Sequence, residues 1–164
     1  MAFLSGFDIS GYGLSAQRFR INLISSNIAN ANTTRTDEGG PYRRREAVFK
    51  AVDFDAILNK NIEKLTGYSK NENPLDDPIG QKFASPPVMA VVVDKVVRDD
   101  TPFKLRFDPS HPDADQNGYI SLPNINPVIE MADLIEATRA YQANVAAFQS
   151  SKSMAQSAID MLKG

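Results

Sequence analysis

The C-terminal stretch of the chain decides the fold class, and over residues 126–164 it reads NPVIEMADLIEATRAYQANVAAFQSSKSMAQSAIDMLKG. Stepping alternately by three and four residues from Met131, eight of ten positions are apolar, which is the a/d pattern of a coiled coil. Those ten positions are Met131, Leu134, Thr138, Tyr141, Val145, Phe148, Lys152, Ala155, Ile159 and Leu162. Asn126 can cap a helix that begins at Pro127, and no later proline interrupts it. The pattern predicts one unbroken helix of about 35 residues, on the order of 50 Å long.

The N-terminal stretch, residues 1–34, predicts a second and less regular helix. Its apolar residues recur at a spacing of seven, at Phe7, Leu14, Ile21 and Ile28. It ends in an Asn- and Thr-rich run, residues 27–34, whose side chains compete for backbone hydrogen bonds and release the helix. The two helices can pack on each other within one small domain. However, apolar rows of this length exceed an average helix of about 11–12 residues, which favours packing against other chains.

The middle of the chain, residues 35–125, predicts a small β-rich module, so the fold class is α+β. Residues 39–41 form a turn, and strands are expected at 42–52, 88–97 and 119–122. Apolar and charged residues alternate from Phe103 to Phe107, which predicts a further, half-buried strand. An insert at about 53–87 predicts a short helix capped by Asp53, followed by an exposed, proline-rich loop.

Composition excludes several classes of protein. The chain has 164 residues, of which 42% are hydrophobic, and this suits one small domain with a modest core. With no cysteine and one histidine, it cannot form Cys/His zinc sites, iron–sulfur clusters, thiol nucleophiles or disulfides. A net charge of −2 argues against a broad nucleic-acid surface. No apolar run approaches the roughly 20 residues that span a bilayer, and the N-terminus does not read as a cleaved secretory signal.

One segment suggests calcium binding. Residues 113–118 read DADQNG and fit the opening of an EF-hand loop, in which closely spaced oxygens surround the ion. The twelfth loop position is Asn124 rather than a bidentate glutamate, and the prolines at 109 and 112 prevent an entering helix. The alternative is a polar turn between two strands, with Gly118 in the left-handed region.

No set of residues predicts catalysis. His111 lies in a loop between two prolines and lacks a Ser, Cys or metal partner in any known motif, so it reads as a turn or surface residue. The run Arg43–Arg45 is diluted by nearby acidic residues and predicts a solvated strand end or an ionic contact with a protein neighbour. We therefore expect no enzyme, cofactor, metal or small-molecule substrate.

Two separated signatures resemble those of the bacterial flagellar rod and hook axial proteins. Residues 14–17 and 25–33, which read LSAQ and SSNIANANT, resemble the N-terminal signature of that family. Residues 130–144 resemble its C-terminal signature, and residues 107–115, FDPSHPDAD, look like a segment typical of a short member of the proximal rod. The resemblance covers about residues 5–52 and 88–162.

The resemblance implies a structural subunit of the flagellar proximal rod, in the basal body, where the rod crosses the periplasm and transmits torque. It implies export through the flagellar type III apparatus without a cleaved signal, and helical polymerisation with other rod proteins and copies of itself through terminal coiled-coil helices. The expected assembly interface comprises Leu14, Ile21, Asn27, Ile28, Asn30, Met131, Leu134, Tyr141, Asn144, Val145, Phe148, Ile159 and Leu162. The remaining alternative is a calcium-binding or other ligand-binding module with a helical oligomerisation arm.

Overall fold

The computed structural model describes residues 2–53, 64 and 89–163, and these form an α+β fold with a long helix at each end. The elements are α1 (Ala2–Ala29), β1 (Arg45–Asp53), β2 (Met89–Arg98), β3 (Lys104–Phe107), β4 (Tyr119–Leu122) and α3 (Pro127–Lys163). The strands confirm the predicted ones to within a few residues. The short helix and the proline-rich loop predicted for the insert lie outside the described residues.

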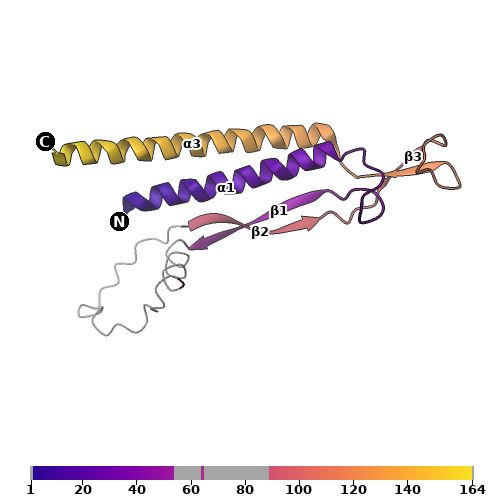
Figure 1. The fold of residues 1–164 in the computed structure, drawn as a ribbon, viewed down its shortest axis with the longest axis horizontal. Coiled ribbons are helices and arrows are strands. Elements are labelled where there is room, and N and C mark those ends of the chain that lie inside the picture. The colour runs from indigo at the N-terminus through magenta and orange to yellow at the C-terminus, as the bar shows by residue number, and fades with distance from the viewer. Residues whose placement is uncertain (1, 54–63, 65–88, 164) are drawn as a thin grey trace.

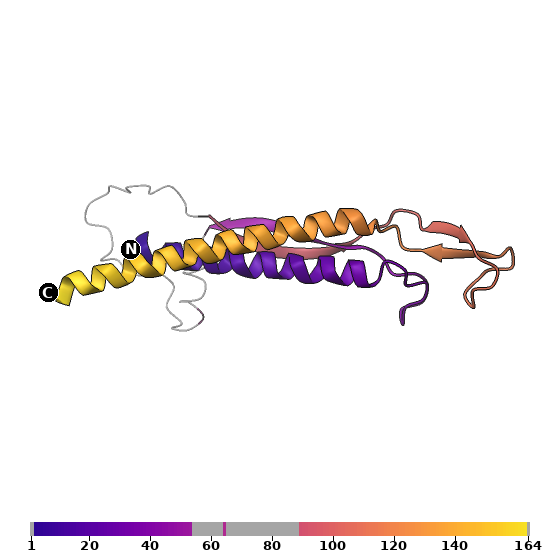
Figure 2. The same ribbon diagram turned by 90° about the horizontal axis from the view of Figure 1, so that it is seen from above.

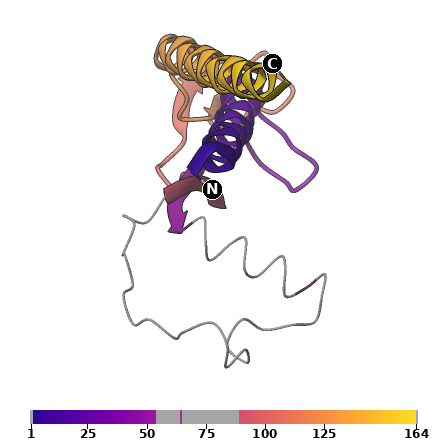
Figure 3. The same ribbon diagram turned by 90° about the vertical axis from the view of Figure 1, so that its left-hand side faces the viewer.

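The molecule is elongated, and α1 is its central layer. In Figure 1, α3 lies along one side of α1, and the twisted β1–β2 ribbon lies along the other; Figure 3 shows the same layers from one end. The helices run antiparallel, so the N- and C-termini lie at the same end of the long axis (Figures 1 and 2).

The predicted helix boundaries follow from capping. The side-chain oxygen of Asn126 accepts a hydrogen bond from the backbone N–H of Val128 at 3.1 Å, and this confirms the predicted cap of the C-terminal helix. At the end of α1, the Asn30 side chain donates to the Ser26 carbonyl at 2.8 Å. The backbone N–H of Ala31 turns back to Ile28 at 3.2 Å, so the helix stops inside the Asn- and Thr-rich run.

Small and polar residues form the contact between α1 and α3. A Cβ added at Gly13 would lie 2.9 Å from the Asn144 side chain, and one at Gly6 would lie 3.5 Å from the Ser151 hydroxyl. Near the start of α1, the rings of Phe7 and Phe148 meet edge to face, with centroids 5.1 Å apart. The α3 row that faces α1 is Glu130, Leu134, Ala137, Tyr141, Asn144, Phe148, Ser151 and Ala155.

Four of the ten predicted a/d positions lie on this row, namely Leu134, Tyr141, Phe148 and Ala155. The other predicted row begins at Met131 and includes Val145, whereas the row that faces α1 begins one residue earlier, at Glu130, and includes Asn144. A count of apolar residues does not select Glu130 or Asn144 for this row. Asn144 fits there because Gly13 has no side chain, and Glu130 fits because Arg44 balances its charge.

Matched glycine substitutions can test this close helix contact. Gly11→Ala should raise the free energy of unfolding by about 1 kcal/mol, because alanine favours helix and nothing lies within 4 Å of its Cβ. Gly13→Ala should gain less or nothing, because the Asn144 side chain must move away. Urea unfolding followed by circular dichroism measures both, and equal gains would contradict the close approach of α3 at Gly13.

The β1–β2 ribbon is antiparallel and carries one bulge. Its pairing runs from Arg45 opposite Arg98 to Asp53 opposite Met89, and the register shifts between Val48 and Phe49. Strands β3 and β4 form a second antiparallel pair. Together with the turn between them they make an arm, residues 104–122, which projects beyond the end of the helix pair where α1 ends and α3 begins (Figures 1 and 2).

The arm corrects one prediction. Strand β3 exists, but Leu105 is 70% exposed and Phe107 is 63% exposed, so the predicted half-burial is wrong. The buried side of the arm is contributed by β4, where Ile120 is fully buried. Alternation therefore identified the strand, but all four residues of β3 are exposed, so it did not identify which side of the arm is buried.

Candidate assembly interface

The first feature that organises the interface is a buried polar junction, formed by Asn27, Tyr42, Arg44 and Glu130. The Asn27 side chain pairs with the backbone of Arg45 through both of its ends. Its oxygen accepts from the Arg45 N–H at 3.0 Å, and its nitrogen donates to the Arg45 carbonyl at 2.9 Å. This is how one strand residue pairs with another, so the side chain of a helix residue fixes the first residue of β1.

The remaining hydrogen-bonding capacity of Asn27 reaches two other elements. The Tyr42 hydroxyl donates to the Asn27 oxygen at 3.1 Å, and the Asn27 nitrogen donates to Glu130 at 3.2 Å. Asn27 is 1% exposed and makes all four bonds that an amide side chain can make. One side chain therefore joins the end of α1, the start of β1 and the first turn of α3.

Glu130 is a buried carboxylate whose charge is balanced by Arg44. The Arg44 Nε donates to Glu130 Oε1 at 2.6 Å, and Arg44 also reaches Glu46 at 3.2 Å and Asp133 at 4.0 Å. Burial acts to lower the pKa of Arg44, but the hydrogen bond and charge of Glu130, with help from Glu46, outweigh it and raise that pKa. Because this ion pair balances its charge, Glu130 can be buried facing α1.

The junction rests on a small apolar core. Ala31, Tyr42 and Ile125 form one buried cluster directly beside it. The two glycines of the predicted turn, Gly39 and Gly40, have φ angles of +89° and +76°, and the turn brings residues 42–45 back against α1.

Outside the contact between the helices, an apolar lateral face remains, which we define by Leu14, Ile21, Ile28, Met131 and Val145. Each follows or lies near a residue that faces the other helix: Leu14 follows Gly13, and Met131 follows Glu130. One residue turns a helix by about 100°. Because α1 and α3 are antiparallel, a one-residue turn in each helix leads to the same side of the pair. The two apolar rows therefore share one face.

The predicted interface residues divide into five groups. On α1, Leu14, Ile21 and Ile28 are half-buried on the lateral face, whereas Asn27 lies inside the junction and Asn30 caps its own helix. On α3, Leu134, Tyr141, Asn144 and Phe148 face α1, and Met131 and Val145 belong to the lateral face. Ile159 and Leu162 lie further along α3 and are exposed. The structure brings most of them to one helix pair, some within it and some on its surface.

One buried polar atom in the helix pair lacks a partner. Within the described part of the chain, Gln17 Oε1 is the buried side-chain oxygen or nitrogen that makes no hydrogen bond. Gln17 lies one turn after Gly13, on the side of α1 that faces α3. An unsatisfied buried acceptor costs about 1–3 kcal/mol.

Gln17→Met should therefore stabilise the isolated chain by about 1 kcal/mol, because a side chain of similar length replaces the unsatisfied amide. Urea unfolding measures the change. The control is Gln142→Met at an exposed α3 position, which should alter stability by less than about 0.5 kcal/mol. Equal effects at both positions would show that the burial of Gln17 is not the cause.

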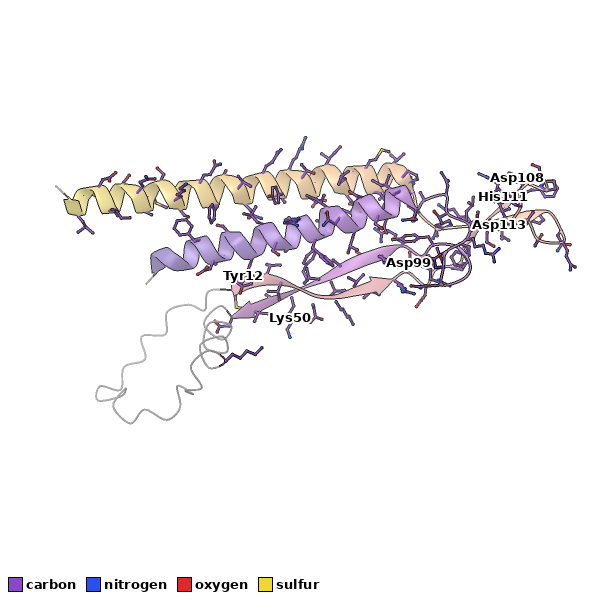
Figure 4. The ribbon with its side chains drawn as sticks, in the orientation of Figure 1. Tyr12, Lys50, Asp99, Asp108, His111 and Asp113 are labelled. Atoms are coloured by element: carbon purple, nitrogen blue, oxygen red, sulfur yellow. The ribbon has the colours of Figure 1, made fainter. Side chains whose placement is uncertain are left out.

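The residues considered for catalysis or as the start of a calcium loop, such as His111 and Asp113, lie together on the arm (Figure 4), where the Asp113 carboxylate accepts a hydrogen bond from the Thr34 hydroxyl at 2.7 Å. Asp115 Oδ1 accepts the backbone N–H groups of Asn117 and Tyr119 at 2.8 and 2.9 Å, and Gly118 has a φ of +78°. This is the polar turn. The Asp113 N–H donates to His111 Nδ1 at 3.1 Å. Among the residues that the structure describes, no group of three or more acidic or histidine side chains is placed to hold a metal ion.

The pKa of Asp108 is lowered, first by the hydrogen bond from the Ser110 hydroxyl and then by the Arg106 guanidinium 3.5 Å away. Both causes are local contacts on an exposed strand end.

Within residues 2–53 and 89–163, no helix combines the length and apolar character that a membrane crossing needs.

Sequence reasoning missed the roles of Tyr42, Arg44 and Glu130. Arg44 was considered only as part of an arginine run at a strand end, and that run does begin β1, but the contact of Arg44 is with α3 of its own chain. The two signatures contain a usable signal. Asn27 lies in one and Glu130 in the other, and polar residues on two helices that pack together can form a hydrogen-bonded pair.

Comparison with known proteins matches the two helices that pack together. The family model described as "Flagella basal body rod protein" matches residues 7–35, and the one described as "Flagellar basal body rod FlgEFG protein C-terminal" matches residues 116–161. The flagellar basal-body rod protein FlgC of Borreliella burgdorferi is 42% identical over the full length of both chains. FlgC of Bacillus subtilis is 35% identical over 99% of this chain and all of that protein. FlgC of Salmonella typhimurium is 34% identical over 94% of this chain and 93% of that protein. The chain belongs to the FlgC family of flagellar basal-body rod proteins.

Proposed function

We propose that this chain is a structural subunit of the flagellar rod that polymerises through the lateral face of its paired helices. The observation that carries the proposal is the composition of the helix contact. Gly13, Asn144 and Glu130 pack within the chain, whereas larger apolar residues such as Met131 lie beside them, with Met131 52% exposed. An apolar face shared by two long helices is a surface for another helix.

Assembly then follows from the asymmetry of the subunit. A patch that binds a different patch on the next subunit generates an open helical filament when the rotation does not close. In the assembled rod, α1 and α3 of neighbouring subunits form a coiled-coil core, and torque is carried by many packed helices together. Apolar burial supplies the driving force, at about 25 cal/mol per Å².

Family membership supports the location and export route that we propose. The subunit is part of the basal body, in the section of the rod that crosses the periplasm, and it reaches that position through the flagellar type III export apparatus without a cleaved signal. Its partners are other rod proteins, copies of itself and that apparatus. A structural role requires no catalysis, and the calcium-binding alternative has no support from the turn geometry of residues 113–118 or from the family.

Met131→Asp should block rod formation and swimming while leaving the isolated chain folded. The side chain at position 131 is exposed in the single chain, so the substitution should not unfold it. In the assembly, the introduced aspartate would be an unpaired buried carboxylate, at a cost of several kcal/mol. Rods are counted in purified basal bodies, and the thermal unfolding midpoint of the variant is measured separately.

The matched control is Met89→Asp on β2, which changes the same residue type at 48% exposure on the other side of α1. It should leave swimming intact. Normal rods in the Met131→Asp strain would show that the lateral face is not the assembly surface. The same test applied to Val145→Asp, which is half-buried, should give the same loss of rods.

A further inference from the structure

The end of α3 carries an apolar row that its own chain does not cover. The row that packs on α1 through Tyr141, Phe148 and Ala155 continues at the same seven-residue spacing to Leu162, and Ile159 lies one turn before Leu162 on the neighbouring row of Met131 and Val145. From the pairing of Gly6 with Ser151, the first residue of α1 lies opposite about Ala155. Residues 156–163, which we call the overhang, run past that point (Figures 1 and 2). Ile159 is 52% exposed and Leu162 is 88% exposed.

A second uncovered apolar patch lies on the arm. Leu105 pairs with Ser121 and Phe107 with Tyr119, so Leu105, Phe107 and Tyr119 share one face of the β3–β4 pair. The rings of Phe107 and Tyr119 meet edge to face, with centroids 5.3 Å apart. A Cβ at Gly118 would lie 3.0 Å from the Phe107 ring, so the absence of a side chain lets the ring lie on the turn. The patch is preformed, although all three large side chains are exposed.

These two patches cannot cover each other within one chain. The arm and the overhang lie at opposite ends of the long axis (Figures 1 and 2). A second copy displaced along that axis would bring its overhang to the arm of the first. Two different patches at opposite ends make a contact that repeats from copy to copy without closing.

Charge does not oppose this contact. The apolar faces themselves carry no charged residue, because Lys104 and Arg106 alternate with Leu105 and Phe107 on the other face of the arm. The arm holds three aspartates against these two basic residues, whereas the overhang holds one aspartate, Asp160, and one lysine, Lys163. The arm is therefore net negative and the overhang net neutral, so the two do not repel each other.

We propose that the overhang of one copy docks on the apolar face of the arm of the next copy, with Ile159 and Leu162 against Leu105 and Phe107. The occupant of each patch is thus a second copy of this chain. The proposal rests on the proposed function, because it names one contact by which the subunit polymerises.

The chain contains no cysteine, so an introduced pair reports on this contact alone. Phe107→Cys and Leu162→Cys are placed in one chain, expressed in cells that lack the native copy, and oxidised in purified basal bodies. We expect bands at multiples of the 18.0 kDa subunit on a non-reducing gel, because each copy can link to the next at both ends. Leu105→Cys with Ile159→Cys provides a second pair in case the first does not assemble.

The control pair is Leu162→Cys with Lys50→Cys, where Lys50 is an exposed residue of β1. It should not produce the series of bands. Subunits present in basal bodies but not cross-linked by either arm pair would overturn the docking proposal. A single cross-linked band that contains another rod protein would overturn the choice of a second copy. Absence of the unsubstituted chain from basal bodies would instead contradict the proposed function.

Opposite charges offer an independent test. Leu162→Glu and Phe107→Lys should each reduce swimming at least tenfold, and the double variant should recover most of the loss. A double variant as impaired as the worse single variant would contradict direct contact between the two positions.

Discussion

Arg44→Met is expected to lower the free energy of unfolding by about 3–5 kcal/mol, the cost of leaving a buried charge without its partner. Glu130 is 1% exposed, and Arg44 is the cation bonded to it, at 2.6 Å. Without Arg44, the carboxylate keeps the Asn27 amide as its side-chain donor. Chemical unfolding of the purified chain, followed by helix content, measures the loss.

Two further variants separate charge burial from the ion pair itself. Glu130→Gln should cost clearly less than Arg44→Met, because Arg44 is partly exposed and keeps Glu46 as a partner at 3.2 Å. The double variant Arg44→Met with Glu130→Leu should recover much of the loss, since no buried charge remains.

The matched control is Arg98→Met. Arg98 bonds Glu38 at the same 2.6 Å, but both side chains are more than half exposed. The Arg98 hydrogen bond and charge lower the pKa of Glu38, yet solvent screens an exposed pair, so its loss should cost much less stability than the loss of Arg44. If Arg98→Met and Arg44→Met destabilise equally, burial does not set the strength of these pairs.

Asn27→Leu is expected to cost roughly 3–6 kcal/mol, because it leaves several buried polar groups unsatisfied at about 1–3 kcal/mol each. The Arg45 backbone loses two bonds, and the Tyr42 hydroxyl and Glu130 each lose one. This loss is comparable with the whole stability of many small domains, so rods should be absent as well. Thermal unfolding and swimming together measure the effect.

Asn30→Leu is the control for Asn27→Leu. Asn30 lies one turn further along and bonds within its own helix end, at Ser26 and Thr33. Its loss should cost about 1 kcal/mol, as for other helix-end caps. A cost at Asn30 equal to that at Asn27 would mean that the connection to β1 and α3 adds nothing.

The helices and strands were predictable because their signals are local. The Asn126 cap, the seven-residue spacing and the alternation in residues 103–107 depend on neighbours a few positions away. The exposure of both faces of β3 was not predictable in this way, because it depends on whether another element packs against the strand. Alternation marks an apolar face but does not show that anything covers it.

The α1-facing row of α3 shows a different limit. Apolar counting chose Met131 and Val145, whereas Glu130 and Asn144 face α1. Hydropathy cannot anticipate that Arg44, 86 positions away, neutralises Glu130, or that Gly13 leaves room for an amide. The contact within the chain therefore combines residues that the rule chose, such as Tyr141 and Phe148, with residues that it rejected, and others that it chose remain on the surface.

The pairing of α1 with α3 also sets the order in which the subunit can mature. Asn27 and Glu130 are 103 positions apart, and protein synthesis begins at the N-terminus. A growing chain therefore holds α1 and the start of β1 without their shared partner until the last quarter of the sequence has been made. Contacts this distant in sequence form late and slowly. A chain that ends before residue 130 lacks the Glu130 carboxylate that joins Asn27 to α3, so it cannot complete the buried junction.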